Sequence, residues 1–495
     1  MKIAFASSEI FPYAKTGGLA DVAGSLPIEL KKLGHDVKVF MPKYNLIDEE
    51  KNGLEYQWDI GEMPIRIDGR VHQVHVHKSL LPDSEVEVYF IDCPFYFHRG
   101  QIYTENWDED ERFILFQKGV IEVIQRLKYQ PDILHCNDWQ TALIPLMLRD
   151  NYKWDRLFDN TATVFTIHNV AYQGRFSKEA FHKAEIEYKY FLDGGVSEYE
   201  GAVNFMKTAI YSADAINTVS ENYARELLTP EYGEGMNAFL SLRKNDFFGI
   251  LNGVDYAIWN PETDKHIPFH YNAEDLTGKK ENKKYLLDKL NLPYNPKIPV
   301  IGIVSRMVSQ KGFDIVADGI EDLVKLEAQW VILGSGEQKY QEMFTYLNKS
   351  LPGKFVSYIG YNNDLAHLIE AGTDIFLMPS KFEPCGLNQI YSLKYGTVPV
   401  VRKTGGLADT VLDWNEYLTQ GLEIGTGYSF WDYNAPALVH SVQRAVNDFQ
   451  LKEVWQKIQL NGMKQDYSWQ KSAVKYIELY EHALKNRNKM PGTKS

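Results

Sequence analysis

Short apolar runs rich in β-branched residues recur along the chain between stretches with helical patterns. The apolar runs predict strands at Lys2–Ser7, Asp36–Pro42, Val86–Ile91, Ile133–His135, Thr163–His168 and Ala215–Val219, and a second series at Val300–Ser305, Trp330–Leu333, Val356–Ile359, Ile375–Pro379 and Val398–Arg402. The stretches between them predict helices at Ala20–Leu33, Glu109–Leu127, Lys311–Leu326, Asp364–Ala371 and Asn388–Tyr395. Strands that alternate with helices indicate an α/β protein with parallel, doubly wound sheets.

A polar, strand-poor region, 261–299, separates the two series of strands. Because 495 residues exceed what one core organises, we expect two domains, at 1–250 and 251–467. Residues 468–495 are expected to hold an amphipathic helix at Ala473–Leu484 and a charged tail, Lys485–Ser495, that frays. Ligands of such domains bind at the carboxyl ends of the strands, so a substrate is expected in the cleft between the domains.

Charge and composition narrow the classes of partner. The formal net charge of −13 argues against a nucleic-acid partner or an anionic membrane. Three cysteines without close spacing predict neither a disulfide framework nor a metal site and favour a reduced compartment. The chain begins on a strand-like run, and no run approaches the roughly 18 apolar residues of a membrane span, so a cytoplasmic protein is expected.

One heptapeptide, Lys-Thr-Gly-Gly-Leu-Ala-Asp, occurs twice, at Lys15–Asp21 and Lys403–Asp409. Each copy follows an apolar run and precedes a helical stretch. Paired glycines there let the backbone approach a ligand and direct N–H groups at an anion beside a helix N-terminus. Ordinary strand-to-helix turns are the alternative.

Two cations follow the predicted strand Val300–Ser305. Arg306 comes directly after the strand, and Lys311 with Gly312 opens the next helical stretch, a pattern that suits a phosphate or diphosphate. Surface charges that cap a loop remain an equal alternative. Gly336, in a Gly-x-Gly after the next strand, is only part of a dinucleotide fingerprint.

Glu383 lies in a loop of the same kind, after the strand Ile375–Pro379 and ahead of Gly386. Its carboxylate could bind sugar hydroxyls while the following helix N-terminus faces an anion, or it could simply complement the helix dipole.

Polar side chains also end strands in the first series. His168, followed by Asn169 and Tyr172, ends one strand, and Asp138 follows another. The histidine stands where ligands of α/β proteins bind, although a structural histidine is an equally ordinary outcome. Asp138 could hydrogen-bond a hydroxylated substrate or cap the next helix.

Two further patterns resemble metal sites. Asp108 and Asp110 form an Asp-x-Asp pattern, but they open a helix, where acids are expected from the helix dipole. His72, His75 and His77 follow an alternating strand, on which only the last two share a face. Neither pattern is interpreted as a metal site, and no P-loop motif is present.

Together these segments resemble the bacterial glycogen synthases and plant starch synthases, glycosyltransferase family 5, over nearly the whole chain. The resemblance is carried, in order along the chain, by Lys15-Thr-Gly-Gly-Leu, His168-Asn, Tyr172-Gln-Gly, Gly249-Ile-Leu-Asn-Gly-Val-Asp255, Ser305-Arg306, Lys311-Gly312, Glu383-Pro-Cys-Gly-Leu387 and Thr404-Gly-Gly-Leu-Ala-Asp409. It implies a GT-B fold, with two Rossmann-like domains facing a deep cleft and a last helix that crosses back to the first domain. It also implies retaining transfer of glucose from ADP-glucose to the non-reducing 4-hydroxyl of an α-1,4-glucan, which elongates glycogen.

The resemblance assigns roles residue by residue. Arg306 and Lys311 match the pair that holds the donor diphosphate and stabilises it as it leaves, Glu383 the acid at the donor glucose, and His168 the histidine at its 6-hydroxyl. The other donor contacts implied are Lys15, Gly18, Gly336, Tyr361 (against the adenine), Cys385, Gly386, Leu387, Thr404 and Gly405; those on the acceptor side are Asp138, Asn169 and Tyr172. No cofactor or metal is implied, and an oligomer is left open.

The chain departs from the family pattern His-x-His-Asp-Trp-His, because Asn137 and Gln140 replace two of the histidines; Asn388 replaces a usual threonine. These departures leave the fine acceptor specificity open. The alternatives are a UDP-sugar-dependent GT-B transferase, an α-glucan phosphorylase, for which the chain is too short, and a catalytically silent glucan-binding relative.

Overall fold

The protein consists of two compact α/β units. The computed structural model describes residues 1–192 and 194–487. Unit 1 comprises Met1–Asn252 together with the C-terminal segment from Trp469, and unit 2 comprises Gly253–Ser468. The divisions predicted from the sequence were at 250/251 and 467/468. Residues 488–495 of the predicted tail lie outside the described residues.

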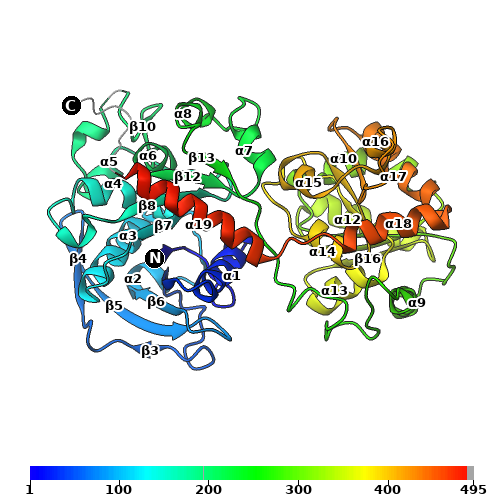
Figure 1. Cartoon of the computed structure of the whole chain (residues 1–495), viewed down its shortest axis with the longest axis horizontal. Coiled ribbons are helices and arrows are strands. Elements are labelled where there is room, and N and C mark those ends of the chain that lie inside the picture. Colours follow the sequence, from blue (N-terminus) through cyan, green and yellow to red (C-terminus); the bar gives the residue numbers. More distant parts are fainter. Residues whose placement is uncertain (193, 488–495) are drawn as a thin grey trace. The chain divides into compact units, whose positions relative to one another are not determined.

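Unit 1 is built on a sheet whose centre is parallel and whose edge is antiparallel (Figure 1). Its strands run in the order β13-β12-β8-β7-β1-β2-β6-β5-β3, with β4 paired to β5, and β9, β10 and β11 form a separate small sheet. Their bounds are β1 Lys2–Ala6, β2 Asp36–Pro42, β3 Glu55–Tyr56, β4 Met63–Ile67, β5 Arg70–Leu80, β6 Glu87–Asp92, β7 Ile133–Asn137, β8 Ala162–Ile167, β9 Arg175–Phe176, β10 Glu198–Tyr199, β11 Ala202–Asn204, β12 Ala215–Thr218 and β13 Phe247–Gly249. The order reverses at β1, whose two neighbours are β2 and β7.

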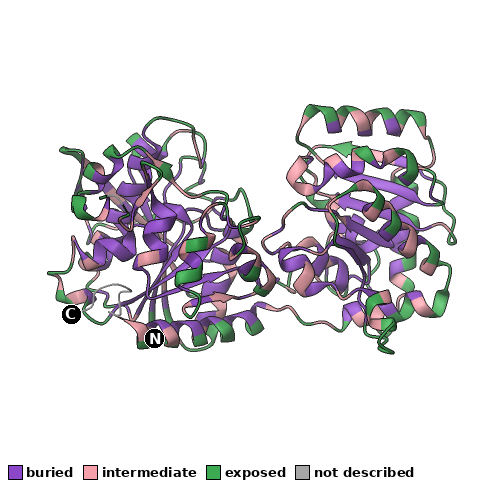
Figure 2. Cartoon of the chain, turned by 90° about the horizontal axis from the view of Figure 1, so that it is seen from above, coloured by how far each residue is buried: buried purple, intermediate pink, exposed green. Residues whose placement is uncertain are grey.

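The central strands of unit 1 are buried on both faces, which is why they appear in the sequence as continuous apolar runs. Ile3, Ala4, Phe5 and Ala6 of β1 have no exposed surface. The helices of this unit are α1 Gly18–Lys32, α2 Pro94–Phe97, α3 Glu109–Arg126, η1 Trp139–Thr141, α4 Ile144–Arg149, η2 Arg156–Phe158, α5 Glu179–Ala184, η3 Tyr188–Tyr190, α6 Phe205–Ser212, α7 Glu221–Leu227, α8 Asn237–Leu242 and α19 Trp469–Asn486. Figure 2 shows buried strands inside each unit and helices whose outer sides are exposed.

Unit 2 has a fully parallel sheet in the order β16-β15-β14-β17-β18-β19. Its strands are β14 Val300–Val304, β15 Gln329–Gly334, β16 Phe355–Ile359, β17 Ile375–Met378, β18 Val398–Arg402 and β19 Tyr428–Phe430. Numbered within the unit, this is the Rossmann order 3-2-1-4-5-6, which reverses between β14 and β17. The prediction of two doubly wound, Rossmann-like domains is confirmed.

The helices of unit 2 correct one prediction. They are α9 Thr277–Lys289, η4 Ser309–Lys311, α10 Phe313–Asp318, α11 Ile320–Leu323, α12 Gln338–Ser350, α13 Asn363–Gly372, α14 Asn388–Lys394, α15 Gly405–Thr410, α16 Trp414–Leu418, α17 Ala435–Phe449 and α18 Lys452–Met463. The helix predicted at Lys311–Leu326 is divided at Gly319, which ends α10 and begins α11. A Cβ at Gly319 would lie 3.1 Å from the side chain of Val439 in α17. The glycine at the break therefore allows the chain to pack closely against α17.

The polar region 261–299 contains no strand among the described residues and separates the two series as predicted, but it also contains a helix that was not predicted, α9. This helix packs against α13 through Leu286 and Leu287, which are fully buried. Because most of its positions are polar, the few apolar positions on its buried face were not enough to predict this helix from the sequence.

The C-terminal helix α19 returns to unit 1, where it packs against α1, β8 and β12 (Figure 1). Tyr480 donates a hydrogen bond to Nδ1 of His135 over 2.8 Å, and His135 Nε2 lies 2.6 Å from Thr166 Oγ1. The hydroxyl of Thr166 in turn donates to Asn217, and all of these side chains are buried. The helix is therefore attached to the sheet by polar as well as apolar contacts. Among the described residues, no helix has both the length and the apolar composition that crossing a membrane requires.

Candidate functional site

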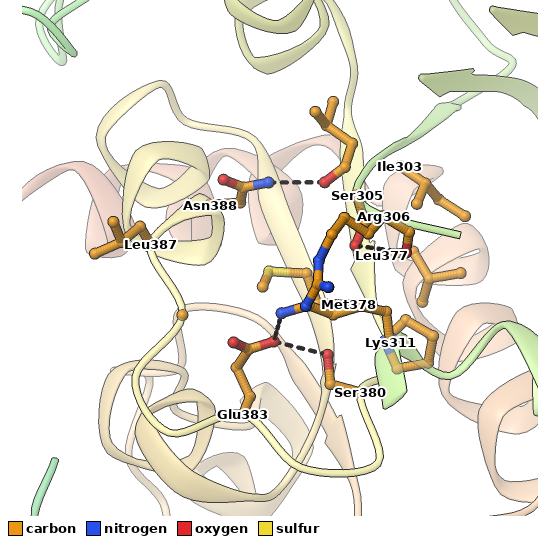
Figure 3. Close-up of a pocket in the computed structure, with 13 residues that line it drawn as sticks. Ile303, Ser305, Arg306, Lys311, Leu377, Met378, Ser380, Glu383, Leu387 and Asn388 are labelled. Atoms are coloured by element: carbon orange, nitrogen blue, oxygen red, sulfur yellow. Dashed lines mark hydrogen bonds and ion pairs between the residues drawn. The ribbon is translucent and has the colours of Figure 1, made fainter. Parts of the chain in front are cut away.

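A pocket opens in unit 2 at the point where the strand order reverses. The chain leaves β14 at Ser305 and Arg306, and it leaves β17 at Pro379. Ligands of doubly wound sheets bind outside the carboxyl ends of strands at this position. The pocket is lined by Ile303, Val304, Ser305, Arg306, Lys311, Leu377, Met378, Pro379, Ser380, Glu383, Gly386, Leu387 and Asn388 (Figure 3).

Glycine at position 312 determines where Lys311 lies. Gly312 follows the 3₁₀ turn η4 and has a φ of +81°, a conformation that favours glycine. A Cβ at this position would overlap the carbonyl oxygen of Pro379. The loop can therefore press against the end of β17, which brings Lys311 to the pocket. The sequence predicted that Lys311 is the first residue of a helix. In the structure the lysine lies on the turn before that helix.

Lys311 and Glu383 form an ion pair inside the pocket (Figure 3). Nζ of Lys311 lies 2.6 Å from Oε2 of Glu383, and the hydroxyl of Ser380 donates to the same oxygen over 3.0 Å. Glu383 is 6% exposed, whereas Arg306 is exposed at the pocket. Two cations and one acid thus converge at a strand-end pocket, and such an arrangement can bind an anion together with hydroxyl groups.

The loop that carries Arg306 is supported from behind by Gly336. Met307, next to the arginine, donates its N–H to Ser335 over 2.8 Å, and its carbonyl accepts from Glu337 N–H over 2.8 Å. A Cβ on Gly336 would overlap the carbonyl oxygen of Met307. The glycine that the sequence marked as a phosphate-binding candidate therefore packs against the Arg306 loop.

The second heptapeptide supports the Glu383 loop in a similar way. Gly405 has a φ of +46°, and a Cβ there would overlap the carbonyl oxygen of Glu383. The N–H of Gly406 donates to the same carbonyl over 3.1 Å. Thr404 is the N-cap of α15, and Cys385 is buried against this turn. The glycines of this copy therefore permit close packing of two protein segments.

Tyr361 stands apart from these residues. It follows β16, is 85% exposed and is not among the residues that line the described pocket. Its hydroxyl donates to Oδ1 of Asn363 over 3.3 Å, and the intervening Asn362 caps α13 by accepting from Leu365 N–H over 2.9 Å. The ring is a free aromatic surface of the kind on which a flat ligand can stack.

In unit 1, Asp138 and His168 lie together at the carboxyl ends of β7 and β8, on one side of the reversal strand β1. Asp138 follows β7, and its carboxylate accepts the backbone N–H of His168, after β8, over 2.7 Å. Asp138 has φ 55° and ψ −178°, a region that residues other than glycine rarely occupy and that is found mostly at functional sites. Burial raises the pKa of Asp138 to about 7 and lowers that of His168 to about 3, so the imidazole is neutral. The other two candidates lie beyond this pair: Asn169 forms a turn with Ala171 over 3.1 Å, and Tyr172 is 61% exposed.

The first heptapeptide is held by Glu9, a residue that the sequence analysis missed. The buried carboxylate of Glu9 accepts from both the N–H and the hydroxyl of Thr16, from Gly17 N–H over 3.1 Å and from the hydroxyl of Tyr103 over 2.6 Å. An acid that follows a predicted strand was the available signal, but its partners lie in two separate segments.

Lys15 itself is paired within its own heptapeptide. Its Nζ lies 2.6 Å from a carboxylate oxygen of Asp21. Gly18 begins α1, and a Cβ at Gly17 or Gly18 would meet no described atom within 4 Å. The two copies thus differ, because the glycines of the first face open space and those of the second press against protein.

Ion pairs account for the Asp-x-Asp pattern that resembled a metal site. Arg99 lies 2.6 Å from Asp108, and Lys183 lies 2.9 Å from Asp110. The histidine strand is observed as β5, with His75 hydrogen-bonded to Tyr56 over 3.2 Å. In the part of the chain that the structure describes, no group of three or more His, Cys, Asp or Glu residues could hold a metal ion.

Both units match models of known protein families. Residues 2–242 match the starch synthase catalytic domain, and residues 288–460 match the glycosyl transferases group 1. The glycogen synthase of Geotalea uraniireducens is 44% identical over 496 residues, which cover 99% of this chain and 100% of the relative. The glycogen synthase of Thermotoga maritima is 43% identical, with 98% of this chain and 99% of the relative covered.

Solved structures agree with these matches. The catalytic domain of starch synthase IV from Arabidopsis thaliana, bound to ADP and acarbose, superposes with a TM-score of 0.88 at 32% identity, covering 98% of this chain and 99% of that chain. Sucrose-phosphate synthase from Thermosynechococcus elongatus shares the fold alone, with a TM-score of 0.58 at 16% identity, covering 97% and 98% of the two chains. The chain is therefore a glycosyltransferase of the GT-B fold and belongs to the family of the bacterial glycogen synthases and plant starch synthases.

Proposed function

We propose that the protein transfers glucose from ADP-glucose to the non-reducing 4-hydroxyl of an α-1,4-glucan, with retention of the anomeric configuration. The observation that carries this proposal is the convergence of Arg306, Lys311 and Glu383 at the reversal point of the unit 2 sheet. Glycogen synthase relatives that match over the full length and a starch synthase structure bound to ADP and acarbose support the same reaction class.

In the proposed reaction, Arg306 and Lys311 bind the diphosphate of the donor. The bond from the anomeric carbon to the diphosphate breaks, and negative charge accumulates on the departing ADP. Fixed cations at that position stabilise this charge without reorganisation, as a divalent ion would in other transferases. The backbone at Cys385, Gly386 and Leu387 is proposed to contact the same phosphates and the sugar, with Thr404 and Gly405 behind it.

The remaining proposed roles are those that the resemblance to the family implies. Tyr361 would stack on the nucleobase with its exposed ring. On unit 1 the proposed donor contacts are Lys15, Gly18 and His168. The proposed acceptor contacts are Asp138, Asn169 and Tyr172.

Glu383 is proposed to bind hydroxyls of the donor glucose and not to attack its anomeric carbon. Its Oε2 accepts from both Lys311 and Ser380, and a carboxylate neutralised in this way is a poor nucleophile. We therefore favour a front-face route, in which the leaving phosphate helps to deprotonate the acceptor hydroxyl. Isolation of a glucosyl-enzyme on Glu383 would overturn that preference.

The test is to incubate the protein with glycogen and either ADP-glucose or UDP-glucose and to measure the nucleotide released and the glucan formed. We expect release from ADP-glucose and much less from UDP-glucose. A preference for the UDP donor would replace the proposed donor, and no transfer from either donor would favour a silent glucan-binding protein. Analysis of the anomeric configuration in the product tests retention.

A further inference from the structure

Asn137 connects the ends of three neighbouring strands in unit 1. It is the last residue of β7, lies between β1 and β8 in the sheet and is fully buried. Its side-chain amide Nδ2 donates to the carbonyl oxygen of Ala6, at the end of β1, over 3.0 Å. Its Oδ1 lies 2.9 Å from Nε2 of His168, just after β8.

These two contacts determine which nitrogen of His168 carries the hydrogen. The carbonyl oxygen of Ala6 can only accept, so the amide must turn its NH₂ group toward it. The amide oxygen then faces His168, and because this oxygen can only accept, Nε2 must carry the hydrogen. Burial keeps the imidazole neutral by lowering its pKa, so Nδ1 bears a lone pair and no hydrogen.

The open nitrogen distinguishes His168 from His135, the buried histidine in the middle of β7. His135 has partners on both ring nitrogens, Tyr480 and Thr166, as a structural histidine does. Within the described residues no protein group hydrogen-bonds Nδ1 of His168, and this atom is not fully enclosed. The backbone N–H of His168 is also held, by Asp138 over 2.7 Å. A fixed histidine thus presents one unused acceptor.

We propose that Asn137 is a positioning residue that locks His168 as the Nε2–H tautomer, so that Nδ1 accepts a hydrogen bond from a substrate hydroxyl. The hydroxyl in question is the 6-hydroxyl of the donor glucose, and this part of the inference rests on the proposed function. The lock also selects against a ligand that offers only an acceptor at this position, because a bare Nδ1 repels it.

The first experiment reads the tautomer directly in the full-length protein. The protein is produced with ¹⁵N-labelled histidine, and the ring signals of His168 are identified by their loss in His168→Gln. We expect a hydrogen-bearing Nε2 and a bare Nδ1 at neutral pH. A hydrogen on Nδ1, a mixture of tautomers or a charged ring in the unliganded protein would overturn the proposal. This measurement needs no Asn137 variant, so it decides even where such a variant fails to fold.

The second experiment separates positioning from a merely structural effect. Asn137→Ala is compared with the unmodified protein on ADP-glucose and on an ADP-6-deoxyglucose donor that lacks the hydroxyl. Loss of the lock should lower kcat/KM for ADP-glucose about tenfold to a hundredfold and should leave the 6-deoxy donor nearly unaffected. A similar loss on both donors would refute the assigned role.

Asn217 supplies a matched control, because it is also a fully buried asparagine near the end of a strand in the same sheet. Its amide contacts Thr166 and Tyr476 and not His168. Asn217→Ala should change kcat/KM by the same factor for both donors, whatever it does to stability. A shift in donor preference in this variant would contradict the assignment to Asn137. If the unmodified protein transfers glucose from no donor, the proposed function fails, while the tautomer measurement still tests the Nε2–H state that Asn137 is proposed to fix.

Discussion

The ion pair between Lys311 and Glu383 should be energetically coupled, because its carboxylate is withdrawn from water. The side chains are 21% and 8% exposed, and the charged atoms are 2.6 Å apart. Lys311→Met removes the cation and leaves the carboxylate with Ser380 as its remaining hydrogen-bond donor among the described residues. Loss of a charged hydrogen bond to a buried group costs about 1.5–3 kcal/mol in the free energy of unfolding. Glu383→Gln should cost less, since the amide keeps an acceptor and carries no charge to desolvate.

A double-mutant cycle measures this coupling. Urea unfolding of unit 2 is followed by hydrogen exchange in its own peptides, so that unit 1 does not contribute. We expect the double variant to lose at least about 1 kcal/mol less than the sum of the two single variants. Lys403 is the matched control, because it also lies 2.6 Å from its partner, Glu416, but that carboxylate is 49% exposed. Lys403→Met should cost less than about 1 kcal/mol.

The same Lys311→Met variant tests the proposed role in transfer. Removing a cation that stabilises the leaving diphosphate should lower the rate of nucleotide release about a hundredfold to a thousandfold. Additive effects of the two single variants on stability would show that the buried pair is not coupled. Near-normal turnover of Lys311→Met would show that the lysine does not contact the leaving group, and the two results together would refute the reasoning.

Three further predictions follow from backbone strain and buried polar groups. Gly312→Ala should destabilise unit 2 by at least about 1–2 kcal/mol and should lower nucleotide release, because the new Cβ overlaps the carbonyl of Pro379; unchanged unfolding and activity would contradict this. Tyr480→Phe should cost about 1–3 kcal/mol in thermal unfolding of unit 1, since His135 Nδ1 loses its donor, and an unshifted melting temperature would argue against the observed bond. Burial raises the pKa of Asp138 to about 7, so its contribution to stability is complete below the unfolded pKa of about 3.9 and is lost as pH rises toward about 7. Asp138→Asn should remove that loss, and parallel pH–stability curves for the two proteins would disprove the shift.

The sequence predicted the central strands because burial on both faces leaves no polar alternation in them. β1 and β18 were found in this way. Short strands such as β19 (Tyr428–Phe430) were missed, since three residues carry too little pattern and their pairing depends on a distant partner. The division of the predicted helix at Gly319 was missed for a related reason, because it depends on packing against α17.

Site residues were predictable where a strand end and its loop are adjacent in the sequence. Arg306, Lys311 and Glu383 fall in this class, and the structure brings them to one pocket. Glu9 and Asn137 were not assigned roles, because their function depends on hydrogen bonds to segments that only the sheet order brings near. The position of Glu9 after a predicted strand was a signal, but a single sequence does not show which distant segments such a side chain contacts.

The doubled heptapeptide shows how neighbours decide what identical residues do. Lys15 pairs with Asp21 of its own copy, whereas Lys403 pairs with Glu416 outside its copy. The first glycine pair faces open space, and the second presses on the Glu383 loop. Each copy lies at the turn into a helix, α1 from Gly18 and α15 from Gly405, but only the second turn follows its strand directly, because residues 7–17 separate β1 from α1. The surroundings of the two turns differ. A side chain introduced at Gly405 should displace the backbone of Glu383 directly, whereas a side chain introduced at Gly18 should affect only the binding of a ligand from solvent.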